Sequence, residues 1–273
     1  MIQAEELKYA YPGSPDVLRG INLTINDGEF VAIMGENGAG KTTLVKTFNG
    51  LLLPTVGTVK VDGVNTRESS VAKLSKDVGL VFQNPDHQLF SETVKQELAF
   101  SLRNFGYGED TIERRVATIL ETLDLTRYAE SSPFVLSGGE RKRVALAAVL
   151  VWNPKHIILD EPTIGQDYQQ KDRLRNFIVQ LNAQGKTVII ITHDVEFVAE
   201  CKPRIVLLSR GLIVGDGPAE AILSDDQLLA RSSMTRPQIG ALMHQLGDLG
   251  LPEGVIDVYS AERAILQTVR RRK

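Results

Sequence analysis

The sequence predicts an α/β protein built on a mostly parallel sheet. Short apolar runs of the kind found in buried parallel strands alternate with longer segments of helical period, and turn residues separate them. A second observation is that residues 84–152 hold almost only helical patterns, which indicates a helical insertion. A third is a change of rhythm near residue 225, after which residues 225–273 are expected to form a small helical appendage.

The first part of the chain supplies strands and one helix. The expected strands span residues 17–25, 29–34, 57–63 and 77–84, and Pro85 ends the last of them. The helix is expected over residues 41–52, directly after a glycine-rich loop. The opening residues 1–13 are mixed and polar, so we expect no signal segment there.

Helices and two further buried strands follow. The expected helices span residues 91–105, 108–125, 137–152, 168–185 and 218–223. The apolar runs at 156–161 and 187–193 are typical of buried parallel strands, and the helix 168–185 joins them. Residues 204–217 predict a hairpin around Arg210-Gly211.

Composition excludes several classes of protein. A net charge of −3 over 273 residues argues against binding nucleic acid through bulk electrostatics, so no nucleic-acid partner is expected. The basic end Arg270–Lys273 is expected to be a solvated terminus. The single cysteine, Cys201, excludes an intramolecular disulfide and a cysteine-based metal cluster. The longest apolar run, 144–152, is about half the roughly 20 residues that cross a bilayer, so another chain must span any membrane at which this protein works.

The stretch Gly35–Thr42 matches the pattern G-x-x-x-x-G-K-[ST] and follows an apolar strand directly. Glycines let successive backbone N–H groups face an anion, and the helix that begins near Lys41 aims its positive end at the same point. Lys41 can reach the β- and γ-phosphates, and the Thr42 hydroxyl can ligate Mg²⁺. A chance glycine-rich turn is the alternative. The residues expected at the phosphates are Gly35, Glu36, Asn37, Gly38, Ala39, Gly40, Lys41, Thr42 and Thr43.

A nucleoside triphosphate needs a metal ion and, for hydrolysis, an activated water. The end of the buried run at 156–161 offers a carboxylate for each task. Asp160 is expected to hold the Mg²⁺ shell, and Glu161 is expected to polarise the attacking water. An acidic pair that only caps a helix is the alternative.

A second glycine cluster stands before a helix at Leu136–Glu140, "LSGGE". The Ser137 hydroxyl and the N–H groups of Gly138 and Gly139 form another helix start suited to an anion. An ordinary capped helix is the alternative. Two phosphate-type sites on one chain leave open what the second site binds.

In this order the motifs "GENGAGKTT", "LSGGERKRVALA", "IILDEPT" and "IIITHD" resemble the ATPase subunits of ATP-binding-cassette (ABC) transporters, over about residues 1–222. The resemblance implies a phosphate-loop (RecA-like) ABC ATPase core with an antiparallel amino-terminal β subdomain, together making a domain of residues 1–224. It implies ATP and Mg²⁺ as cofactors. It also implies a head-to-tail dimer in which "LSGGE" of one subunit closes on the nucleotide of the other.

Four further residues match positions of the family. Tyr11 matches the aromatic residue that stacks on adenine, and Gln83 matches the glutamine that senses Mg²⁺ and the attacking water. His193 matches the histidine that contacts the γ-phosphate and orients the carboxylate of Glu161. Asp167 matches the loop that crosses to the partner's site. A packing or turn role is the alternative for each.

Two positions depart from the family pattern. Glu140 stands where glutamine is commoner, and the crossing loop reads "TIGQD" with Gln166 in place of leucine. The second departure puts the detailed coupling of the two sites in doubt. Since Glu161 and His193 are retained, hydrolysis is still expected.

A narrower resemblance is to the ATPases of energy-coupling factor (ECF) importers, including those for cobalt and nickel. Residues Phe82–Phe100, "LSGGERKRVALAAVL" and the carboxyl-terminal stretch Met234–Leu266 carry it. It implies import of a vitamin or a transition-metal ion, with a transmembrane coupling protein and a substrate-binding membrane protein as partners. The chain would lie on the cytoplasmic face of the cell membrane, and its extension 225–273 would help hold two ATPases together. The ATPase of another ABC transporter type, or a non-transport ABC protein, are the alternatives.

Overall fold

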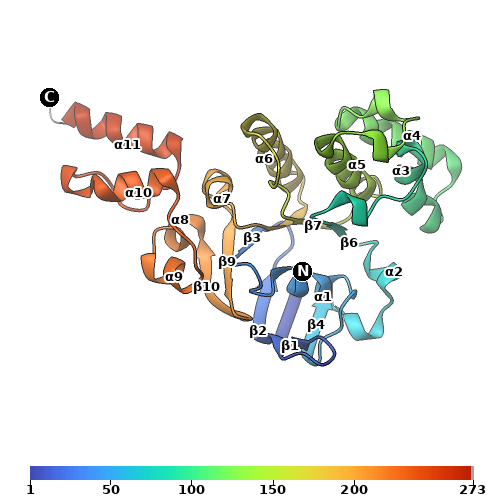
Figure 1. Cartoon of the computed structure of the whole chain (residues 1–273), viewed down its shortest axis with the longest axis horizontal. Helices are drawn as coiled ribbons and strands as arrows, with labels where there is room; N and C mark the ends of the chain where they lie inside the picture. The colour runs from blue at the N-terminus through green and yellow to red at the C-terminus, as the bar shows by residue number, and fades with distance from the viewer. Residues whose placement is uncertain (272–273) are drawn as a thin grey trace.

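The structure is a computed structural model that describes residues 1–271 (Figure 1). Residues 272–273, part of the terminus expected to be solvated, lie outside the described residues. The described chain contains a six-stranded sheet, a four-stranded sheet beside it, and helices grouped on either side (Figure 1). This arrangement confirms the predicted α/β class.

The six-stranded sheet is parallel except for one edge strand. Its strand order is β10-β9-β3-β8-β7-β6, and only β10 runs antiparallel, as the second arm of the predicted hairpin. Because both faces are covered, every residue of the central strands β7 and β8 is buried, and their middle residues are all apolar. The strands are β3 (Phe30–Met34), β6 (Val78–Val81), β7 (His156–Asp160), β8 (Thr187–Ile191), β9 (Arg204–Ser209) and β10 (Leu212–Pro218).

The four-stranded sheet is antiparallel, with the order β2-β1-β4-β5. It confirms the predicted antiparallel subdomain but contains a strand, β1, that the sequence pattern did not indicate. β1 holds two glutamates in succession, and the register shifts around Glu5 and Glu6 break the alternation that marks a strand. The strands are β1 (Ile2–Ala10), β2 (Asp16–Ile25), β4 (Val56–Val61) and β5 (Val64–Asn65).

Helix α1 joins the two sheets into one body. Leu44 and Phe48 of α1 are fully buried, in a core shared with residues of both sheets such as Leu7 and Ile33. The main helices of the core are α1 (Lys41–Phe48), α2 (Val71–Leu74), α6 (Tyr168–Ala183) and α7 (Val195–Cys201). Helix α1 is shorter than expected because a turn begins after Asn49.

The helices α3, α4 and α5 stand together at one end of the molecule (Figure 1). They lie between β6 and β7 in the chain, where a helical insertion was expected. Ile112, Val116 and Leu120 of α4 share one buried stripe, as their spacing predicts. The helices are α3 (Val94–Asn104), α4 (Glu109–Thr122) and α5 (Gly138–Leu150).

The last part of the chain is helical. Helices α10 and α11 project at the end of the molecule opposite α3–α5 (Figure 1), and Met243, Ala261 and Ala264 form a small core between them. Leu229 and Ile256 instead belong to the main core. The helices are α8 (Ala219–Ile222), α9 (Asp226–Arg231), α10 (Gln238–Gln245) and α11 (Val258–Arg271). Among residues 1–271, no helix is both long and apolar enough to cross a bilayer.

Candidate active site

The loop between β3 and α1 needs glycine at two positions. Gly35 has φ +142°, and a β-carbon there would lie 2.0 Å from the carbonyl oxygen of Leu208. Gly40, directly before α1, has φ +103°, and its β-carbon would lie 2.9 Å from Leu18. Since α1 begins here without a side-chain cap, its first N–H groups are left for a ligand. The backbone of the loop is therefore compatible with the anion cradle that the glycine pattern predicts, and phosphate binding there stays a prediction.

Lys41 is buried at the base of this loop. Its Nζ donates hydrogen bonds to the carbonyl oxygens of Gly35, at 2.8 Å, and Glu36, at 2.9 Å. Burial lowers the pKa of Lys41, while the charges of Glu161, Asp160 and Glu36 oppose this shift. A cation held by neutral carbonyls in a buried position gains strongly from an incoming anion, so Lys41 is suited to phosphate oxygens.

Asp160 ends β7 and faces the start of α1. Its Oδ2 accepts a hydrogen bond of 2.9 Å from the Thr42 hydroxyl, and its Oδ1 is buried with no partner in the described structure. Burial raises the pKa of Asp160, against the hydrogen bond from Thr42. A buried carboxylate oxygen beside a hydroxyl is a hard oxygen donor set that fits Mg²⁺. The two residues expected at the metal therefore lie together.

Glu161 follows in a left-handed backbone conformation, with φ 48°. Its N–H donates to the carbonyl of Ile191, at 2.8 Å, which ties the turn after β7 to the end of β8. Its Oε1 lies 2.8 Å from Nδ1 of His193, and its buried Oε2 has no partner among the described atoms. A carboxylate with one oxygen oriented by a histidine and the other unengaged is arranged to accept a proton from water.

Gln83 and Tyr11 border the site from two sides. Gln83 follows β6 and lines the same cavity as Asp160 and Glu161. The hydroxyl of Tyr11 lies 3.3 Å from Oγ1 of Thr43, and its ring packs edge-on against Tyr9, with centroids 5.0 Å apart. Tyr11 is 40% exposed, which leaves ring surface for a planar ligand beside the loop.

Ser137 is the N-cap of α5 and forms a capping box with Glu140. The Glu140 carboxylate accepts from Ser137 N at 2.8 Å and from Ser137 Oγ at 2.7 Å, and Tyr128 donates to it as well. These hydrogen bonds, that of Tyr128 first, lower the pKa of Glu140 to about 2. The departure from glutamine is thus accommodated by a charged cap at a helix start.

Helix α5 stands apart from α1 within the chain (Figure 1). Hydrogen bonds and charge interactions bring Lys41, Thr42, Asp160, Glu161 and His193 together within residues 1–271. Ser137 and Gly139 line the same cavity as Gln83 and Glu161. Asp167 is engaged elsewhere, as the N-cap of α6, where its Oδ1 accepts from Gln170 N at 2.8 Å.

Two polar residues that the sequence patterns do not single out brace the Gln83 loop. Gln88 donates to the carbonyl of Ala145 on α5, at 2.7 Å, and accepts from Phe82 N at 3.3 Å. Glu97, which is 4% exposed, accepts from the N–H groups of Phe90, at 2.9 Å, and Ser91, at 2.7 Å. The sequence could have pointed to Glu97, because a glutamate on the apolar face of a helix is unusual.

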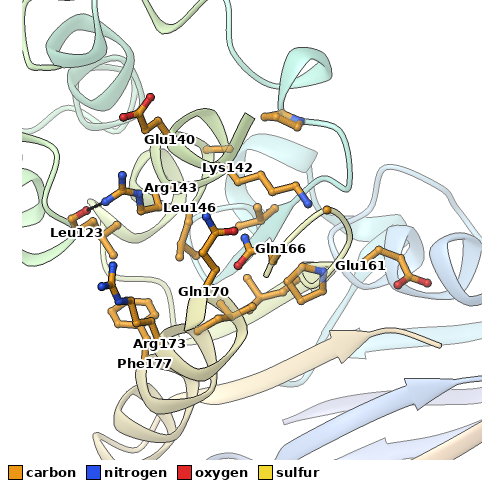
Figure 2. Close-up of a pocket in the computed structure, with 18 of the residues that line it drawn as sticks. Leu123, Glu140, Lys142, Arg143, Leu146, Glu161, Gln166, Gln170, Arg173 and Phe177 are labelled. Carbon is orange, nitrogen blue, oxygen red and sulfur yellow. Dashed lines mark hydrogen bonds between the residues drawn. The ribbon is translucent and has the colours of Figure 1, made fainter. Parts of the chain in front are cut away.

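A cavity of about 610 Å³ lies between α5 and α6 (Figure 2). It extends from Gln83 and Glu161 toward Arg173 and Phe177. Lys142 reaches across it from α5 toward the loop that carries Gln166 (Figure 2).

Comparison with known proteins gives a family match and close relatives. Residues 18–164 match the family model described as ABC transporter. The energy-coupling factor transporter ATP-binding protein EcfA of Methanothermobacter thermautotrophicus is 41% identical over 248 residues, which cover 90% of this chain and 80% of the relative. EcfA2 of Clostridium perfringens is 38% identical over 280 residues, which cover 98% of both chains. A longer ABC transporter relative from Caldanaerobacter subterraneus is 42% identical, and the match spans 43% of its length.

Two solved structures resemble the whole chain or its cassette. The structure of cbiO1 from Clostridium perfringens, described as part of the ABC transporter complex cbiONQ, has a TM-score of 0.76 and 34% identity, covering 91% of this chain and 98% of that one. The dimeric structure of the cassette MJ0796, in a post-hydrolysis state with ADP and phosphate, has a TM-score of 0.72 and 30% identity, covering 80% of this chain and 99% of that one.

Proposed function

Because the chain belongs to the ABC transporter family of ATP-binding proteins, we propose that it is the ATP-hydrolysing motor subunit of an ECF-type importer. The observation that carries this proposal is the cluster at the carboxyl edge of the parallel sheet. There Lys41 is buried among carbonyl oxygens, Thr42 bonds Asp160, and His193 bonds Glu161.

In this proposal the loop Gly35–Thr43 binds the triphosphate of ATP, and Tyr11 stacks on the adenine. Lys41 leaves the carbonyls of Gly35 and Glu36 for the phosphate oxygens. Thr42, Asp160 and Gln83 would hold Mg²⁺, which supplies positive charge for the γ-phosphate when bound. Glu161 accepts the proton of the attacking water through its unengaged Oε2, and His193 keeps the carboxylate oriented and contacts the γ-phosphate.

A second subunit completes the site. Helix α5, which Ser137 caps, stands apart from α1 of its own chain (Figure 1), and this supports a head-to-tail dimer in which Ser137, Gly138 and Gly139 reach the opposite nucleotide. The dimeric structure of the MJ0796 cassette with ADP and phosphate supports a dimer as the working assembly. Each ATP then contacts both subunits, so ATP favours the closed dimer by its differential affinity. Asp167 would cross to the opposite site in the same way.

The membrane partner would contact the loop that follows Gln83. Phe90 and Phe100 are 58% and 46% exposed and pack edge-on, with ring centroids 4.7 Å apart. An exposed aromatic pair beside a catalytic loop suits a helix of a transmembrane coupling protein. Glu97 and Gln88 would transmit movement of this loop to α3 and α5. The chain would then work at the cytoplasmic face of the cell membrane, with a substrate-binding membrane protein in the same complex.

The cargo is proposed as a vitamin or a transition-metal ion, from the ECF names of the relatives and the cbiONQ neighbour. The motor of another ABC transporter type is the second candidate, supported by the family model itself. Affinity purification of the tagged chain from membranes separates the two. An ECF motor is expected to bring a small coupling protein and a substrate-binding protein, whereas a different pair of permease subunits would contradict the ECF assignment.

The phosphate-loop role has its own test. Lys41→Ala is expected to lose most nucleotide affinity and turnover, measured by equilibrium binding and phosphate release. Wild-type affinity and turnover in this variant would contradict the role of Lys41.

A further inference from the structure

Lys142 joins two parts of the chain that the proposed function assigns to different nucleotides. It lies on α5, whose first turn follows Ser137, and its Nζ donates a hydrogen bond to the carbonyl oxygen of Ile164. Ile164 lies midway between Glu161 and Asp167 in the chain. The lysine therefore connects the helix that would serve the opposite nucleotide to the loop that begins at the chain's own Glu161.

Lys142 lies partly buried within the influence of a carboxylate. Burial lowers the pKa of Lys142, while the charge of Glu161 opposes that shift. The side chain lines the cavity of about 610 Å³ between α5 and α6 and points toward the loop that carries Gln166 (Figure 2). Because this space is not filled by packed side chains, the link depends on the lysine more than it would in a close-packed core.

Gln170 of α6 lies close to the start of α5. A β-carbon built on Gly139 would lie 3.5 Å from its Nε2. The Oε1 of Gln170 accepts from the N–H of Asp167, at 3.3 Å. The start of α5 and the loop before α6 thus meet within one chain, through Lys142 on one side and Gln170 on the other.

We propose that Lys142 is a positioning residue that couples the two nucleotide sites of the dimer. The inference rests on the proposed function. When the opposite γ-phosphate draws in the start of α5, Lys142 transmits that displacement to the carbonyl of Ile164 and so to the loop that fixes Glu161. The residue touches neither nucleotide. It makes hydrolysis at one site depend on occupancy of the other.

The test compares Lys142→Met, Lys142→Arg and a matched control, Lys186→Met. Lys186 is also partly buried with a pKa lowered by burial, and it donates to the carbonyls of Asn153 and Pro154 at the opposite edge of the sheet. Lys142→Met is expected to lower kcat for ATP about tenfold with KM unchanged, a smaller loss than the 100-fold that a misplacement of about 1 Å can cause. Lys142→Arg should restore most of kcat, and Lys186→Met should leave kcat unchanged.

Mixed dimers separate coupling from a local effect on Glu161. Two differently tagged copies are paired with ATP, and one copy carries either Glu161→Gln, which keeps its nucleotide without turning it over, or Lys41→Ala, which loses it. Lys142→Met in the competent copy is expected to slow that copy beside the Glu161→Gln partner and to have little further effect beside the Lys41→Ala partner. An equal loss beside both partners would show a local effect and overturn the coupling, as would an unchanged kcat or a parallel rise in KM. Absence of ATP turnover by the wild-type chain would contradict the proposed function and this inference together.

Discussion

At the carboxyl edge of the six-stranded sheet, Asp160 and Glu161 each keep one buried oxygen without a partner in the described structure. At the amino edge, Asp27 and Asp62 instead lie against cations: Lys155 bonds both, at 2.9 and 2.7 Å, and so does the amino group of Met1. Both edges thus hold a pair of carboxylates. The two edges differ in whether cations of the chain itself neutralise the carboxylates.

The difference in pairing appears in the pKa shifts. Burial raises the pKa of Asp160, whereas hydrogen bonds from the amino group of Met1 and from Lys155 lower that of Asp27. For Asp62, burial would raise the pKa, but bonds from Lys155, Met1 and His156 outweigh it and lower the pKa. Charge paired within the chain stabilises the fold, and charge left unpaired is available to a ligand.

Asp27, Asp62 and His156 also place ligand atoms within 4.8 Å of one another, as a metal site would. The two cations already bonded to both carboxylates give this cluster a structural explanation, so we assign it no metal.

The largest expected effect is at the carboxyl edge. Glu161→Gln keeps the size of the side chain but removes the proton acceptor, so ATP turnover is expected to fall by about 10²–10⁴-fold, the usual contribution of a general base. Phosphate release is the measurement, and Glu121→Gln on the exposed face of α4 is the control. Turnover near that of the wild type would remove Glu161 from the role of base.

Asp160→Asn should reveal the cost of leaving a charge unpaired. The raised pKa of Asp160 means that its ionised form is disfavoured in the fold. Protonated Asp160 contributes fully to stability at pH values below its pKa in the unfolded chain. This contribution is lost as the pH rises through its higher pKa in the folded chain. At pH 7 the ligand-free variant is therefore expected to melt higher than the wild type, while Mg²⁺-dependent turnover falls. The gain in melting temperature should shrink toward pH 4, and a lower melting temperature at pH 7 would contradict the argument.

The carboxyl-terminal helices are anchored near the amino edge, since Lys202 bonds Asp257 at 2.7 Å. Leu266 on α11 is 48% exposed and lies outside the small core between α10 and α11. If α11 holds two subunits together, Leu266→Glu is expected to raise the dissociation constant of the ATP-bound dimer about tenfold, or 1.4 kcal/mol. ATP affinity of the separate chain should not change. Light scattering measures the dimer, with Val71→Glu as an exposed control; an undiminished dimer would remove this role from α11.

The smallest effect is expected at the amino edge. Lys155→Met leaves Asp27 and Asp62 facing each other, but Lys155 is 42% exposed, so the loss of stability should be about 1 kcal/mol. Because the fold lowers the pKa of both aspartates, their ionised forms stabilise the fold at pH values above their pKa in the unfolded chain. This contribution is lost as the pH falls through their pKa in the folded chain. The free energy of unfolding of the wild type should therefore fall more between pH 7 and pH 3 than that of Lys155→Met. Denaturation at the two pH values measures this difference. ATP turnover should stay the same, and a fall in turnover would break the contrast between the edges.

The sequence indicated the carboxyl edge well and the amino edge hardly at all. The phosphate loop and the pair Asp160-Glu161 are local patterns, because each needs neighbouring residues in a fixed backbone conformation. The ion pairs of Asp62 with Lys155 and His156 join residues more than 90 positions apart, and no periodicity encodes such a contact. Strand β1 was missed for a related reason, since its bulge disturbs the alternation that marks a strand.

The same limit applies within the candidate site. His193 could be placed beside Glu161 only by resemblance, and the structure joins them at 2.8 Å. Lys142 and Gln88 act through backbone carbonyls, which carry no residue-specific signal in the sequence. Residues whose partner is the backbone of a distant segment therefore need the folded chain before their role can be argued.

If the carboxyl edge of one chain is an incomplete ATP site that a second subunit covers, ATP must control both the assembly and the activity of the chain. Both can be followed through the molar mass of the purified chain with ATP and Mg²⁺ and its turnover per chain across a range of protein concentrations. We expect the mass to double with ATP and the turnover per chain to rise with concentration until the dimer is saturated. A chain that remains monomeric at every concentration while hydrolysing ATP at its full rate would contradict this expectation.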